Sequence, residues 1–117
     1  MNTHSAIHNY LLQLGFSPRM KGFRYLSELL QNSLTGNIFP LHRVGYPILA
    51  QYHATTTVNI DKNIQNAISH AFLRAQLDEL YLEFGETLDP SKGKPTAKQF
   101  LCHAREKLLS IMTDLVV

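Results

Sequence analysis

The segment from residue 47 to residue 70, PILAQYHATTTVNIDKNIQNAISH, constrains the fold of this chain more than any other. In its second half, apolar side chains recur at spacings of four, three, one and three residues, which places them on one stripe of an α-helix. These side chains are Ile60, Ile64, Ala67, Ile68 and Ala71. The pattern predicts an amphipathic helix over residues 57–74 with this stripe in the core.

A short apolar segment and a hydroxyl-rich turn come before that helix. Residues 41–53 predict a first helix that turns Ile48, Leu49 and Tyr52 inward. Residues 54–57, Ala-Thr-Thr-Thr, break the pattern, and a threonine oxygen can accept an orphan backbone N–H of the next helix. The segment therefore predicts a helix-turn-helix, in which the second helix is a candidate for reading DNA.

The outer face of the second helix is rich in amides, whereas a solvated helix more often exposes Glu and Lys. Asn, Gln and Lys carry donors and acceptors that fit base edges in a major groove. The candidates for base contact are Asn59, Asp61, Lys62, Gln65 and Asn66. Any surface helix also needs a polar face, so this pattern alone leaves DNA reading and simple solvation both open.

Length and charge limit the classes of protein that fit. A chain of 117 residues is expected to form one domain, residues 1–117, with a single core that needs no disulfide or metal. It has no apolar run of about twenty residues and no signal peptide, so we expect a cytoplasmic protein without a membrane partner. Residues 1–74 carry a net charge of +4 and residues 75–117 carry −2. This distribution favours salt-sensitive phosphate contact by the first part.

The whole chain predicts an all-α fold, a compact bundle of about six helices that contains the helix-turn-helix. The expected helices cover residues 3–14, 19–35, 41–53, 57–74, 77–84 and 95–112. The last of them opens with Pro95 in its first turn. Leu115, Val116 and Val117 then lie beyond it as an exposed apolar end that could pack against a second subunit.

Residues that often carry chemistry form no catalytic pattern here. His4 and His8 have a spacing that can hold a metal, but no third ligand is recognisable, so both are expected to be surface histidines. Cys102 is expected to be a small buried thiol without a role. Motifs of the GxSxG, HExxH and CxxC types are absent from the sequence. We therefore expect neither an enzyme nor a cofactor.

Several stretches resemble the C-terminal effector domain of the stage 0 sporulation protein A family, in collinear order from residue 7 to about residue 108. They are Ile7-His8, Leu14-Gly15-Phe16, the heptapeptide MKGFRYL at 20–26, Tyr46-Pro47, Thr55-Thr56, Ala67-Ile68, Phe84-Gly85 and GKPT at 93–96. The combination of KGFRYL and GKPT with a helix-turn-helix is specific. The resemblance implies a DNA-binding transcriptional regulator of sporulation, with double-stranded DNA as its partner and the helix over residues 57–74 in the major groove.

The sequence departs from that family on the reading helix. The family pattern has a Pro, then Arg, Glu and Arg, and then an Arg-His pair. The matching positions here hold Thr57, Asn59, Asp61, Lys62 and the pair Gln65-Asn66. Loss of guanidinium groups removes bidentate contacts to guanine, and Asn or Gln would suit adenine instead. Either the chain reads a different DNA sequence, or it has lost tight DNA binding and acts as a protein-interaction module that modulates a related regulator.

Phosphate contacts and assembly complete the expectations. Lys21, Arg24, Thr56, Thr57 and Lys94 are candidates for contact with DNA phosphates, while plain solvation stays open for the three charged side chains. Family members ordinarily carry an N-terminal receiver domain, which does not precede Met1 here, so the sequence is either a fragment or a stand-alone protein. We expect a monomer or a weak homodimer that pairs on DNA carrying two tandem sites.

Overall fold

The computed structural model describes residues 2–74, 83–84 and 93–116, and this part of the chain is entirely helical between its turns and loops. It contains α1 (Thr3–Gln13), α2 (Lys21–Thr35), the π-helical turn η1 (Leu41–Gly45), α3 (Tyr46–Tyr52), α4 (Thr57–Arg74) and α6 (Ala97–Val116). The predicted all-α class is confirmed. Five α-helices are described rather than about six, because the helix expected over 77–84 lies, apart from residues 83 and 84, outside the described residues.

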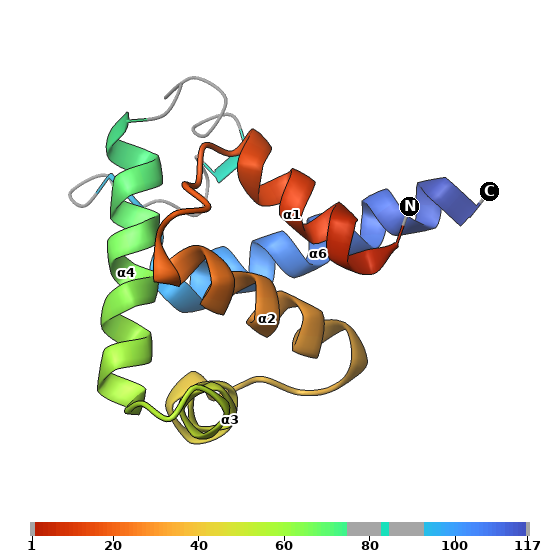
Figure 1. Ribbon diagram of the computed structural model, residues 1–117. Coiled ribbons are helices and arrows are strands. Elements are labelled where there is room, and N and C mark those ends of the chain that lie inside the picture. Colours follow the sequence, from red (N-terminus) through yellow and green to blue (C-terminus); the bar gives the residue numbers. More distant parts are fainter. Residues whose placement is uncertain (1, 75–82, 85–92, 117) are drawn as a thin grey trace.

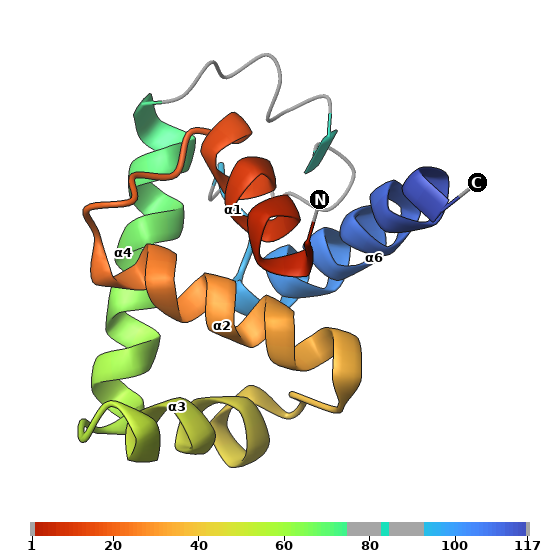
Figure 2. The ribbon, with the colours of Figure 1, turned by 45° about the vertical axis from the view of Figure 1, so that its right-hand side comes forward.

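Helix α2 is the centre of the arrangement. It contacts α1, α3, α4 and α6, and its most extensive packing is against α4. Figures 1 and 2 show α4 running along one side of the molecule, with α3 near its lower end, while α1, α2 and α6 extend away from it on the same side and α6 begins beside it. This arrangement leaves the outer side of α4 free of other described helices.

The core is formed by the apolar stripes of these helices. All five members of the predicted stripe on α4 are at most 2% exposed. Fully buried partners face them from α2 and α6, among them Leu26, Leu29, Leu30, Phe100 and Leu108. Truncating one such buried side chain to Ala typically costs about 2–5 kcal/mol of stability, so the rear of α4 is held firmly.

A glycine allows α2 and α4 to pack closely. A Cβ atom on Gly22 would lie 2.2 Å from the carbonyl oxygen of Asn63 and 2.6 Å from the Cβ of Ala67. Real side chains do not approach so closely, so any larger residue would separate the two helices. The position of α4 therefore depends on the glycine in the KGFRYL stretch.

The turn between α3 and α4 is closed by backbone and hydroxyl hydrogen bonds. The Thr55 N–H donates to the Ala50 carbonyl at 2.9 Å, and Ala54 adopts a φ of 53°, as in the Schellman motif that ends many helices. Thr56 then caps α4, because its Oγ1 accepts the N–H of Asn59 at 3.0 Å. The predicted capping by a threonine is confirmed, and Thr56 is the residue that does it.

The inward orientation predicted for Ile48 and Tyr52 is wrong. Leu49 is buried as expected, but Ile48 is 51% exposed and Tyr52 is 74% exposed. α3 has only seven residues, so it buries a single narrow face, and that face holds Tyr46, Leu49 and Ala50. Ile48 and Tyr52, four residues apart, share the solvent side.

Helix α6 also differs from the prediction at both ends. Thr96 and Gln99 form a reciprocal capping box, so the helix begins at Ala97 and Pro95 precedes its cap. The helix continues to Val116, so Leu115 and Val116 belong to it rather than to a tail, and Val117 lies outside the described residues. Cys102 is exposed, not buried, because the buried stripe of α6 uses Phe100, Leu101, Ala104 and Leu108.

Candidate nucleic-acid interface

The outer side of α4 carries the five predicted base-contacting residues. Lys62, Gln65 and Asn66 are exposed, whereas Asn59 and Asp61 are half-buried at the two edges of this face. The helix that carries them is capped at Thr56 and fixed from behind by its buried stripe. The structure therefore brings all five residues onto one rigid surface, but it does not leave them equally free.

Asn59 is held by hydrogen bonds within the unit. Its Nδ2 donates to Thr55 Oγ1 at 2.8 Å, which ties the helix to the preceding turn. Its Oδ1 lies 3.2 Å from Asn63 Nδ2, which also donates to the Asn59 carbonyl at 2.8 Å. A bidentate contact to adenine needs the amide oxygen and nitrogen together, so Asn59 is better suited to positioning the helix than to reading a base.

Asp61 and Gln65 form a second pair. Gln65 Nε2 donates to Asp61 Oδ2 at 2.8 Å across one helical turn. On its other side Asp61 lies near the Tyr46 hydroxyl, and burial, together with the negative charge of Asp61, raises the pKa of Tyr46 well above its usual value. Asp61 therefore belongs as much to the support of α3 against α4 as to the outer surface.

Lys62 and Asn66 are the free members of the set. Both side chains are exposed, and neither has a hydrogen-bond or ion-pair partner among the described residues. They lie four residues apart, so they are neighbours on the same face of α4. Each can therefore offer its full hydrogen-bonding capacity to a ligand at this surface.

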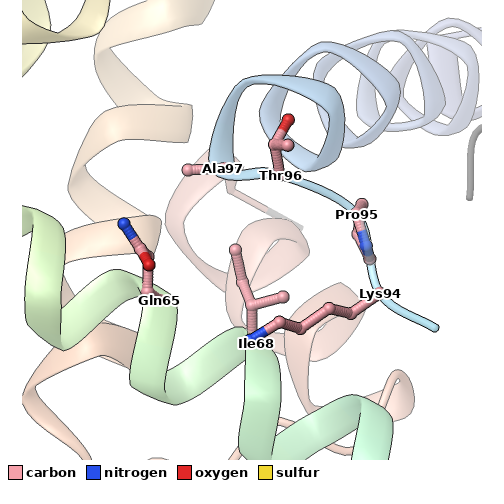
Figure 3. A pocket seen from close by; sticks show the side chains of 6 residues that line it. All are labelled: Gln65, Ile68, Lys94, Pro95, Thr96 and Ala97. Carbon is pink, nitrogen blue, oxygen red and sulfur yellow. The ribbon is translucent and has the colours of Figure 1, made fainter. Parts of the chain in front are cut away.

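Lys94 is engaged with α4. Its Nζ donates to Ser69 Oγ, and Figure 3 shows its side chain reaching from the loop before α6 toward α4. Lys94, Pro95, Thr96 and Ala97 line one side of a hollow of about 190 Å³, and Gln65 and Ile68 of α4 line the other. Lys94, the predicted phosphate ligand, thus also links the GKPT loop to α4.

Lys21 and Arg24 lie exposed on α2, and Arg24 begins a chain of contacts toward the turn. Arg24 Nε lies 3.8 Å from Glu28 Oε1, and Glu28 Oε2 lies 2.6 Å from His53 Nε2. His53 is the C-cap residue of α3, directly after Tyr52. Sequence reasoning missed this link, because Glu28 and His53 are twenty-five residues apart and share no motif.

Two further cations near α4 were missed as well. A hollow of about 580 Å³ between η1, α4 and the start of α6 is lined by Arg43 and Lys98 together with Asp61 and Gln65. Both cations are exposed and have no ion-pair partner in the described part of the chain. The sequence signal was their positive charge alone, which does not show that they flank the outer face of α4.

The paired histidines of α1 lie on another side of α2. The His4 and His8 rings are 4.2 Å apart between centroids, and His8 also contacts Phe23. Burial, and secondarily the neighbouring His4, lower the pKa of His8. Among residues 2–74, 83–84 and 93–116, no group of three candidate metal ligands comes together.

The fold and this surface define a small helical domain in which an exposed polar helix is held from behind by a buried core. Comparison with known protein families identifies its family: residues 7–108 match the family described as "Sporulation initiation factor Spo0A C terminal". The chain therefore belongs to this family of DNA-binding effector domains of sporulation regulators, which is a regulatory and not an enzymatic family. No helix in the described residues is long and apolar enough to span a membrane.

Proposed function

We propose that this chain is a sequence-specific DNA-binding transcriptional regulator, with α3, the turn and α4 acting as its helix-turn-helix. In this proposal α4 lies in the major groove of double-stranded DNA. The observation that carries it is a pair of polar side chains, Lys62 and Asn66, that have no partner in the described part of the chain and lie on the exposed face of a helix whose opposite face is fully buried. A rigid helix that presents free donors and acceptors is what base reading requires.

The hydrogen bonds within α4 suggest that the five candidate residues have different roles in binding DNA. Asn66 is free to pair with adenine, and Lys62 is free to bind guanine. Gln65 keeps one N–H and its oxygen for a base while its other N–H holds Asp61. Asn59 acts through the helix by anchoring it to Thr55.

Phosphate contacts frame this reading surface in the proposal. Lys21 and Arg24 project from α2, and Thr56 and Thr57 stand where the unpaired backbone N–H groups of α4 begin, a place suited to a phosphate. Lys94 contributes from the other side while it clamps the GKPT loop. On DNA with two tandem sites, two chains are expected to bind side by side, and the free chain is expected to be a monomer or a weak dimer.

A binding titration with single variants tests the proposal. Lys62→Ala and Asn66→Ala should each weaken binding to a selected duplex by about 1–3 kcal/mol and relax one base preference. Lys107→Ala, which removes an exposed lysine of α6, is the matched control and should leave that preference unchanged. Equal effects of all three variants on every duplex would contradict base reading by α4.

The phosphate assignments have a different signature. Replacing Lys21, Arg24 or Lys94 by Ala should weaken binding to all duplexes alike and reduce the salt slope by about 0.9 for each phosphate that is no longer neutralised. The melting temperature should be compared as well, because Lys94 also holds Ser69. An unchanged salt slope in all three variants would show that these side chains are merely solvated.

The exposed apolar residues of α3 favour a second candidate function. Ile48 and Tyr52 form an apolar pair on the solvent side of the short helix, and such pairs often contact proteins. In this alternative the chain has lost tight DNA binding and modulates a related regulator through α3. Ile48→Ser with Tyr52→Ser should then abolish regulator binding, whereas under the DNA-reading proposal the double variant retains its selected site.

A further inference from the structure

Two exposed side chains of α4, Val58 and Leu73, do not belong to its polar set, and Val58 is the one at the N-terminal end of the helix. Val58 is 75% exposed, although it lies in the first turn of the helix. It is neither part of the buried core cluster nor one of the partly buried side chains packed against that cluster. Val58 also contributes little to the stability of the helix itself, because helix N-termini favour Ser, Thr, Asp and Glu over a β-branched apolar residue.

Val58 shares a surface with the two free polar residues. Positions 58, 62 and 66 follow one another at intervals of four, so Val58, Lys62 and Asn66 lie along one stripe of α4. The Thr56 cap and the Asn59 bond to Thr55 fix the turn that carries Val58. The N-terminal residues of a reading helix are the ones that reach base edges.

From this placement we propose that Val58 is a specificity-determining residue that reads the C5-methyl group of a thymine. The inference rests on the proposed function, since it requires α4 to lie in the major groove. The thymine methyl is the apolar group that distinguishes bases on the major-groove edge. A valine side chain has a restricted χ1 and therefore loses little rotamer freedom when it packs on that methyl.

The stripe also fixes where the thymine should lie. Four residues of helix rise by about 6 Å, which corresponds to about two base pairs of 3.4 Å each. The thymine is therefore expected about two base pairs from the base that Lys62 contacts. Removal of the methyl group should weaken binding by about fourfold, from the usual value for a buried methylene.

The experiment uses deoxyuridine, which pairs as thymine does but lacks the methyl group. The intact chain first selects its preferred duplex from a random pool, and each thymine of that duplex is then replaced in turn by deoxyuridine. Affinity is measured for the unsubstituted protein and for Val58→Ala, with Leu73→Ala as the control. Leu73 is an 80% exposed apolar residue near the other end of the same helix.

At one thymine, the substitution should weaken binding of the unsubstituted protein and of Leu73→Ala by about fourfold, and it should have a clearly smaller effect on Val58→Ala, whose shorter side chain lies farther from the methyl group. Identical deoxyuridine profiles for Val58→Ala and the unsubstituted protein would overturn the inference while leaving the proposed function intact. Failure of the unsubstituted protein to select any duplex would overturn both. Circular dichroism and melting of Val58→Ala confirm that the comparison is made between folded proteins.

Discussion

At the scale of single residues, the structure separates side chains that look alike in the sequence. Asn59 and Asn66 are both amides on the outer face of the same helix, but Asn59 is hydrogen-bonded to Thr55 and Asn63, whereas Asn66 has no hydrogen-bond partner among the described residues. Residue type and helical spacing correctly predicted which side chains share this face. They could not predict the pairing, because it depends on the geometry of the turn that precedes the helix.

The turn itself offers a residue-scale prediction. Ala54 adopts a left-handed backbone with a φ of 53°, which costs an L-residue about 1–2 kcal/mol relative to glycine. Ala54→Gly should therefore raise the free energy of unfolding by about 1 kcal/mol, after allowance for the greater freedom of glycine in the unfolded chain. Urea unfolding measures the change.

Ala97→Gly is the matched control for that substitution, because Ala97 lies in the first turn of α6. A glycine there should lower stability slightly rather than raise it. A destabilised Ala54→Gly would show that the turn does not hold the conformation described, and α4 would then lack its fixed starting point.

At the scale of elements, the bounds of α4 were predicted correctly as residues 57–74. Five turns of helix with one consistent apolar stripe give a strong signal. The two turns of α3 give only a weak signal, because so short a helix buries too few side chains to show which face is inward. Ile48 and Tyr52 were predicted to face inward for this reason, whereas both are exposed. The close approach of Gly22 to α4 could not be predicted either, because the two segments are forty residues apart.

That close approach gives the prediction at this scale. Gly22→Ala places a methyl group where the Asn63 carbonyl and Ala67 already lie, so α2 and α4 must move apart. The free energy of unfolding should fall by about 1–3 kcal/mol or more, and DNA affinity should fall with it, because the support of the reading helix has shifted. Urea unfolding and a binding titration measure the two effects.

Gly36→Ala is the control, since a Cβ there would meet only the Asn32 carbonyl at 3.8 Å, an ordinary separation. It should leave both stability and DNA affinity close to those of the unsubstituted protein. If the two alanine variants were equally stable, the close packing of α2 on α4 would not determine where the reading helix stands.

At the scale of the whole molecule, stability should depend on the ionisation of two buried tyrosines. Burial, followed by the charges of Glu83 and Asp61 respectively, raises the pKa of Tyr10 and of Tyr46 above the value of about 10 expected in the unfolded chain. Above pH 10 the unfolded chain loses these protons while the folded chain keeps them. The free energy of unfolding should therefore fall as the pH rises, by up to about 1.4 kcal/mol per pH unit for each tyrosine.

Tyr46→Phe isolates one of the two contributions. Among the described residues, no partner lies within ordinary hydrogen-bond distance of the Tyr46 hydroxyl, and Asp61 acts on it mainly as a nearby charge, so the variant should be nearly as stable as the unsubstituted protein at pH 8. At pH 11, Tyr46→Phe should be more stable than the unsubstituted protein by about 1.4 kcal/mol. Tyr52→Phe, at an exposed position, should have the same free energy of unfolding as the unsubstituted protein at pH 8 and at pH 11. If the unsubstituted protein, Tyr46→Phe and Tyr52→Phe all lost the same stability between these pH values, Tyr46 would not be a source of the alkaline loss.

In the proposed function, α4 presents polar side chains that read DNA bases. Selection from a random duplex pool by the intact chain, at low and at moderate salt, is the decisive measurement. We expect enrichment of one motif that persists at moderate salt and loses a base preference in Asn66→Ala. Retention of duplexes at low salt without any enriched motif would contradict it.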